Sequence, residues 1–192
     1  MSLNCYEISA DIVAAICQQP PTAGTGDVMY IMNFDDVDKA NSTISSNVIS
    51  SILMDSGKTA YSFSTIPDSV MGSSSVNVGT YFTTIQQDVI LRAHAKTEAA
   101  KAFINNALGS KLMVIVQNRE IGSEGEVKWE LYGWDSGLEV TALESSTDMA
   151  DETVYSLTVG SGERSKEGTL PKSVWDTDIS TTEAMLASLL SS

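Results

Sequence analysis

In the segment Lys111-Leu112-Met113-Val114-Ile115-Val116-Gln117, five apolar residues follow one another without a break. A short apolar run rich in β-branched residues predicts a buried β-strand. A second run of this kind, Val28-Met29-Tyr30-Ile31-Met32-Asn33-Phe34, ends at the acidic turn Asp35-Asp36-Val37-Asp38. The chain is therefore expected to be built on buried strands.

More strands are predicted on either side of these two runs. Residues 76–95 form a long stretch in which Val89 and Leu91 share one face while Ile90 and Arg92 share the other. This alternation is typical of a strand with one solvated side. The remaining predicted strands cover residues 48–54, 60–66, 127–134, 138–143 and 154–159.

Three connections are predicted from their composition. Asp55-Ser56-Gly57-Lys58 has turn chemistry, so the strands at 48–54 and 60–66 are expected to form a hairpin. Residues 69–75 are small and polar, which favours a loop. Residues 161–173 are polar and are expected to be irregular.

Two helices complete the pattern. Thr97 is a suitable N-cap for the first helix, and Gly109 stands where a left-handed C-cap belongs. The spacing of Ser180-Thr181-Thr182-Glu183 is that of a capping box and predicts a short C-terminal helix. The apolar positions at helical spacing are Ala99, Ala100, Phe103, Ile104, Ala107 and Leu108 in the first helix, and Met185, Leu186, Leu189 and Leu190 in the second.

These elements predict one mainly β domain over residues 1–192. The expected architecture is a β-sandwich or barrel with one flanking α-helix, extended polar loops and a short C-terminal helix. The composition agrees, since 27 Ser and 17 Thr with only 19% charged residues suit exposed strands and polar loops.

The charge of the chain restricts its partners. The net charge is −14, divided into −5 for the first 96 residues and −9 for the rest, so the acidity is spread along the chain. Such a protein repels nucleic acid, because phosphate binding needs clustered Lys and Arg. A surface past which DNA slides without sticking is still compatible with this charge.

No compartment signal is expected from the sequence. No apolar run reaches the roughly 18–20 residues that span a bilayer, and the first seven residues lack the basic and apolar parts of a signal peptide. Cys5 and Cys17 are too few for a disulfide framework. The expectation is folding in a reducing cytoplasm with free thiols.

Candidate catalytic and metal-binding residues lack their partners. His94 lies on the polar side of its strand, with no nucleophile nearby in sequence and no G-x-S-x-G motif in the chain. Asp35, Asp36 and Asp38 begin like a calcium loop without its later glycine and glutamate. Glu124 and Glu126 form a carboxylate pair at an exposed turn, without the enclosed pocket that separates the pKa values of two catalytic carboxyls. Cys5, Cys17 and His94 would supply three zinc ligands at most and lack the paired spacing of a zinc site. The chain is thus predicted to have no catalytic, cofactor-binding or metal-binding residue, and not to be an enzyme.

Three features favour self-assembly instead. The charged loop at residues 119–126 is expected to project as an arm, and long apolar strands such as 112–116 leave edges that a ring could pair. The polar stretches 22–27, 69–75 and 161–173 are of the kind that orders against a neighbour. Each feature also has an ordinary interpretation, namely a surface hairpin, an interior strand or a plain loop.

The order of these segments resembles the major tail tube proteins of tailed phages and prophages of Bacteroidetes. The likeness is strongest in Glu130-Leu131-Tyr132-Gly133-Trp134-Asp135-Ser136-Gly137-Leu138-Glu139. It also involves Cys5-Tyr6 followed by the strand at 28–34, the strand–helix join at 91–108, the hairpin at 112–134 and the segment 148–159.

The resemblance implies a virion protein made in the host cytoplasm, with no membrane association. Its subunits would form rings, expected to be hexameric, by joining sheets across subunits, and the rings would stack through a long loop or hairpin. Other phage tail proteins would be partners, and genome DNA would pass through an acidic lumen without specific binding.

Other functions remain open at this stage. A ring or hub component of a short-tailed phage, or the inner tube of a contractile injection device, would share the fold. An adhesion or carbohydrate-binding β-sandwich is the alternative from another class, with Trp129, Tyr132 and Trp134 as a sugar platform.

Overall fold

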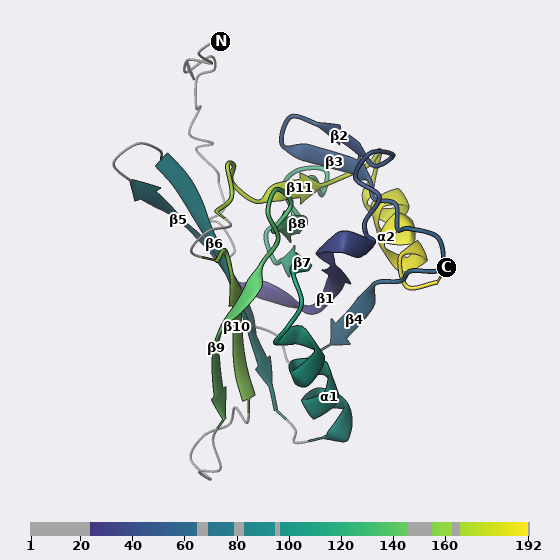
Figure 1. Ribbon diagram of the computed structural model, residues 1–192. Helices are drawn as coiled ribbons and strands as arrows, with labels where there is room; N and C mark the ends of the chain where they lie inside the picture. The colour runs from purple at the N-terminus through teal and green to yellow at the C-terminus, as the bar shows by residue number, and fades with distance from the viewer. Residues whose placement is uncertain are drawn as a thin grey trace.

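The computed structural model describes residues 24–64, 69–78, 83–94, 97–145, 155–162 and 166–191, with the side chain of Asp27 excepted (Figure 1). The described residues form two β-sheets, two α-helices and one short 3-10 helix. The prediction of a mainly β protein with a sandwich-like core, a flanking helix and a short C-terminal helix is confirmed.

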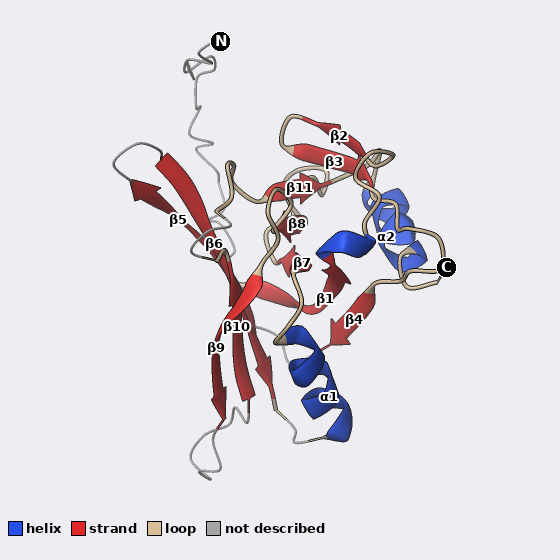
Figure 2. Cartoon of the chain, in the orientation of Figure 1, coloured by secondary structure: helices blue, strands red, loops and turns tan. Residues whose placement is uncertain are grey.

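The larger sheet has seven strands in the order β2-β3-β11-β8-β7-β1-β4, and the smaller has four in the order β5-β6-β10-β9. Figure 2 shows the smaller sheet on one side of the larger sheet, with α1 at the end nearest β4. The larger sheet contains β1 (Thr25–Asn33), β2 (Thr43–Ser45), β3 (Val48–Ser51), β4 (Tyr61–Ser64), β7 (Leu112–Asn118), β8 (Trp129–Tyr132) and β11 (Lys172–Val174). The smaller sheet contains β5 (Val70–Val78), β6 (Thr83–Ala93), β9 (Glu139–Ser145) and β10 (Tyr155–Gly160).

The apolar run of β7 is explained by burial on both faces. Leu112, Val114 and Val116 point into the core between the two sheets. Met113 and Ile115 point to the opposite face, where α2 (Ile179–Ser188) supplies Leu186 and its C-cap residue, Leu189. A strand covered on both sides has no polar face, so it appears in sequence as an unbroken apolar run. β1 pairs with it in antiparallel register, from Met29 opposite Val116 to Asn33 opposite Leu112.

The first helix is α1 (Glu98–Ala107), and its start agrees with the sequence. The hydroxyl of Thr97 accepts a hydrogen bond from the backbone N–H of Ala100 at 3.1 Å, as an N-cap does. The left-handed cap expected at Gly109 is wrong, because Gly109 does not have a positive φ. The helix ends at Ala107 with Leu108 as its right-handed C-cap, and Ser110 then donates its N–H to the carbonyl of Ala107 and its hydroxyl to the carbonyl of Asn106.

The C-terminal helix begins earlier than the capping box predicts. Asp178 is the N-cap of α2, and its carboxylate accepts the backbone N–H of Thr181 at 2.8 Å. The hydrogen bonds to Ser180 and Thr181 lower the pKa of this carboxyl. Glu183 pairs with Lys128 across the sheet and does not reach back to the cap.

The predicted hairpin between residues 48–54 and 60–66 is wrong. β3 pairs with β2 and β11, whereas β4 pairs with β1 at the other end of the sheet. The chain between them is held by contacts outside the sheet plane: Met54 bridges Val37, and the N–H of Ala60 donates to the carbonyl of Leu189 at 2.7 Å. Asp55-Ser56-Gly57-Lys58 therefore form a turn that does not join two paired strands.

Two polar stretches are more ordered than predicted. Residues 70–75 belong to β5, which pairs with β6 from Val70 opposite Leu91 to Val78 opposite Thr83, so the predicted loop is wrong. The region 161–173 contains β11 and a bridge between Glu167 and Ile85, so it is not irregular throughout. Backbone pairing requires no apolar side chain, and polar composition alone therefore misassigned both segments.

Candidate assembly surface

The hairpin formed by β5 and β6 extends past the end of the core. Val70 is buried between the sheets, and Gly72 lies directly under the ring of Tyr132. Val76 and Val78, on the same face of β5, are 63% and 77% exposed. Figure 2 shows this end of the hairpin standing apart from the seven-stranded sheet. The apolar face of β5 thus continues to a point where the described residues of the chain leave it exposed.

Among the described strands β5 is also the outermost of its sheet, so within this part of the chain one of its backbone edges has no partner strand. An open edge invites pairing with another chain, and proteins usually block it with a charge, a proline or a short strand. β5 is nine residues long and reads Val-Met-Gly-Ser-Ser-Ser-Val-Asn-Val, with none of these features. The opposite edge strand, β9, carries Glu139 and Glu144. The β5 edge is therefore the less protected of the two.

The base of this hairpin is fixed by a buried glutamine. Gln87 of β6 accepts the backbone N–H of Gly133 and donates to the carbonyl of Thr169, both at 2.9 Å. Gly133 follows β8, so the side chain joins the two sheets and the segment before β11. A hairpin held this firmly at its base can present a fixed surface at its tip.

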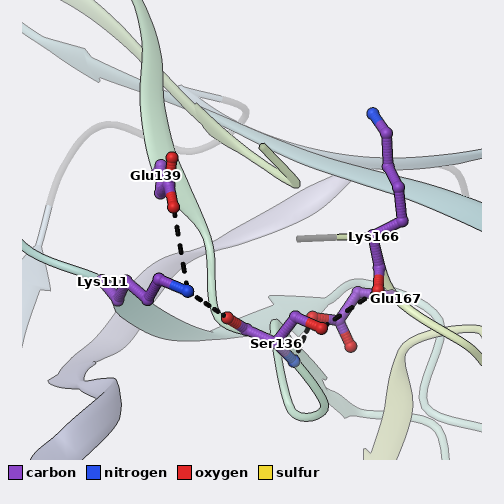
Figure 3. A network of polar contacts seen from close by, with 5 residues as sticks. All are labelled: Lys111, Ser136, Glu139, Lys166 and Glu167. Atoms are coloured by element: carbon purple, nitrogen blue, oxygen red, sulfur yellow. Dashed lines mark hydrogen bonds and ion pairs between the residues drawn. The ribbon is translucent and has the colours of Figure 1, made fainter. Parts of the chain in front are cut away.

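A buried carboxylate completes the same junction. The two oxygens of Glu167, which is 1% exposed, accept the backbone N–H groups of Asp135 and Ser136 at 2.8 and 2.9 Å. Figure 3 shows Glu167 beside Ser136, with Lys111 joining Ser136 to Glu139. Burial raises the pKa of Glu167, against the effect of the two backbone N–H groups, which lower it.

Lys39 reaches the same turn from the other side. Its ammonium donates to the carbonyl of Trp134 at 2.7 Å and lies 3.4 Å from the ring centroid of Phe34. Burial lowers the pKa of Lys39, while the nearby Glu167 carboxyl acts to raise it. The 133–138 turn is thus held by Gln87 of β6 and by two side chains of opposite charge, Glu167 and Lys39, from separate segments of the chain.

The segment that carries the family resemblance is this turn. Gly133 and Gly137 have φ values of +81° and +77°, which favour glycine, and the N–H of Gly137 donates to the carbonyl of Gly133. The segment therefore has a structural role in connecting the sheets. The long-range partners Gln87 and Glu167 could not be found from local sequence, because they lie more than 30 residues away.

The charged loop at residues 119–126 is only in part the projecting arm that the sequence suggests. Its residues 121–124 are exposed. Gly125 is buried against Trp175 and Ile179 at the start of α2, and a side chain there would lie 2.2 Å from Ile179. Glu126 accepts the N–H of Glu124, which closes the turn. The second half of this loop belongs to the fold, and β5 with β6 is the longer projection.

The candidate chemical residues stay apart. The Nε2 atom of His94, on the side of its strand predicted to be polar, lies 2.8 Å from the hydroxyl of Ser69, and the residue is half-buried. Asn33 and Lys58 hydrogen-bond Asp36 and lower its pKa, while Asn41 does the same for Asp38. Cys5 and Cys17 lie outside the described residues. Over the part of the chain that the structure describes, no three His, Cys, Asp or Glu side chains gather as a metal site would require.

The three aromatic rings proposed as a sugar platform are buried. Tyr132 contributes to the core between the sheets, where burial and the neighbouring Glu130 raise its pKa. Trp129 and Trp134 contribute to the core on the α2 side, and the ring of Trp129 packs 5.6 Å from that of Tyr30. A carbohydrate cannot stack on these rings in this fold.

Neither of the described helices is long and apolar enough to cross a membrane. No family model, no curated protein and no solved structure matches the chain. Function therefore has to be inferred from the surface itself.

Proposed function

We propose that this chain is a structural subunit of a phage tail tube that assembles with copies of itself into rings. The observation that carries the proposal is the β5–β6 hairpin, with its open, uncharged edge and its exposed Val76 and Val78. A two-stranded ribbon is marginally stable alone in water, so an apolar projecting one is expected to gain a partner.

The charge of the chain supports the choice of a tube. Copies with a net charge of −14 repel each other, so they must meet through neutral surfaces such as β5. The remaining acidic surface would line a channel that repels the phosphates of passing DNA. The resemblance centred on the 133–138 turn supplies the hexameric ring and its place in the virion. A single ring or hub would use the same contacts without stacking.

Negative-stain electron microscopy of the purified full chain tests this proposal. Rings with a central hole, alone or stacked into tubes, are the expected result. Stacks would favour the tube, and isolated rings the hub. A uniform monomer that binds members of a glycan array would contradict the proposal and favour an adhesion module. As a second readout, the protein should not retard duplex DNA in a gel at low salt.

A further inference from the structure

An apolar groove lies between α1 and the ends of both sheets. Its volume is about 370 Å³. Among the described residues that line it, none is charged. The apolar residues along its walls are Phe63, Leu91, Ala93, Phe103, Ile104 and Leu157. The rings of Phe63 and Phe103, which both line the groove, pack on each other in a tilted arrangement with their centroids 6.2 Å apart.

One wall of the groove is an open strand edge. β4 is the last strand of the seven-stranded sheet and pairs only with β1 within the described chain. All four of its residues, Tyr61 to Ser64, line the groove. A strand that added to this edge would gain backbone hydrogen bonds and could place alternate side chains in the groove.

The groove and the exposed valines lie at opposite ends of the β5–β6 hairpin. Leu91 of β6 lines the groove, whereas Thr83 of β6 pairs with Val78 at the tip. Eight residues of extended strand separate them by about 26 Å at the usual rise per residue. The paired strand β6 is rigid along this length, so the tip cannot enter the groove of its own chain.

Charge and polarity match between the two surfaces. The tip offers a neutral strand with Val76 and Val78 on one face and hydroxyl or amide side chains on the other. The groove offers an uncharged apolar floor with hydroxyls from Ser62, Ser64 and Thr97. In a chain with a net charge of −14, such neutral surfaces are where two copies can approach without repulsion.

We propose that the groove beside α1 receives the β5 hairpin tip of a second copy of this chain. Val76 and Val78 enter the groove next to Phe103, and the free edge of β5 pairs with the free edge of β4. Because donor and acceptor surfaces differ, the contact is head-to-tail and repeats from copy to copy, closing a ring or extending a filament. This inference rests on the proposed self-assembly and identifies the receiving surface.

Photocrosslinking of the full chain tests the contact. A benzophenone amino acid at position 78 should crosslink to a second copy at residues 61–64 or 97–107, as identified by mass spectrometry. The same probe at Ser75, on the opposite face of β5, is the matched control and should give few crosslinks to those peptides. Crosslinks from position 78 to any other region, including residues 1–23, would overturn the proposed occupant.

A charge-pair experiment provides a second, independent test. Val78→Lys alone and Ser64→Glu alone should each raise the concentration needed for assembly by about tenfold, since each buries an unpaired charge. Both sites are exposed in the single chain, so thermal unfolding of the monomer should change little. Mixing the two variants should restore assembly. The tip that carries Val78→Lys in one variant then meets the groove that carries Ser64→Glu in the other, and the unchanged tip of the second meets the unchanged groove of the first.

The outcomes separate this inference from the proposed function. Rings with crosslinks elsewhere, or an absence of rescue in the mixture, would overturn the groove contact and leave the ring proposal standing. A wild-type chain that never assembles would overturn both.

Discussion

The side-chain oxygen of Gln87 accepts the backbone N–H of Gly133 at 2.9 Å, and this bond joins the four-stranded sheet to the end of β8. Both residues are buried. Gln87→Leu keeps much of the volume but leaves the N–H of Gly133 without an acceptor. The free energy of unfolding should fall by about 1–3 kcal/mol, the usual cost of an unsatisfied buried donor.

Urea unfolding of dilute protein measures this loss. Asn105→Leu, at an exposed position of α1, is the control and should stay within about 0.5 kcal/mol of wild type. Equal stability of Gln87→Leu and wild type would show that the junction contributes nothing.

Glu167 gives a pH dependence with a defined sign. Burial raises its pKa in the folded protein, so the folded state holds this proton more tightly than the unfolded chain. Its contribution to stability is then greatest at low pH and declines as the pH rises through the raised pKa. The free energy of unfolding of wild type minus that of Glu167→Gln should therefore decrease as the pH rises above 4.5, the ordinary pKa of a glutamate.

The check is unfolding of both proteins at several pH values, with the exposed Glu98→Gln as the control for losing one negative charge. A difference that grows with pH would mean that the backbone N–H groups outweigh burial at Glu167.

Ile104 near the end of α1 and Leu108, the C-cap of this helix, should differ in their effect on stability. Ile104 is buried against the sheets, whereas Leu108, one turn further, is 54% exposed. Ile104→Ala should cost about 2–4 kcal/mol, and Leu108→Ala less than about 1 kcal/mol. Chemical denaturation of the two variants checks whether α1 packs as described; similar losses for both would contradict it.

Assembly should respond to ionic strength. Copies with a net charge of −14 repel each other, and raising the salt from about 0.01 M to about 0.1 M shortens the Debye length from about 30 Å to about 10 Å. The concentration needed for assembly should therefore fall as salt rises, because the proposed contact itself is uncharged. Light scattering across a salt series measures this; weaker assembly at higher salt would indicate a contact made by ion pairs.

The central strands and the first helix could be predicted because their signals are local. β7 is apolar on both faces, and Thr97 with the spacing of Phe103, Ile104 and Ala107 marks α1. The part of β5 up to Ser75 was missed because Ser73, Ser74 and Ser75 have little strand propensity, and pairing with β6 overrides that preference. The false hairpin arose because turn residues say nothing about which distant strand becomes the partner.

The candidate surface was only in part accessible from sequence. Val76 and Val78 fall in a stretch predicted to be β, but their exposure depends on where the other sheet ends. Glu167 and Gln87 were hidden for a related reason, since a buried polar residue is recognisable only when its distant partners are known. The loop at 119–126 was predicted to project because it is charged. Its packing against the start of α2 depends on a distant segment and cannot be predicted from that charge.

Sedimentation velocity of the full chain over a concentration series tests self-assembly most directly. The expected result is a species of fixed mass, a whole-number multiple of 20.5 kDa, that forms from the monomer as concentration rises, and that the Val78→Lys variant forms only at about tenfold higher concentration. A wild-type protein that sediments as a 20.5 kDa monomer at every concentration and salt would contradict the account.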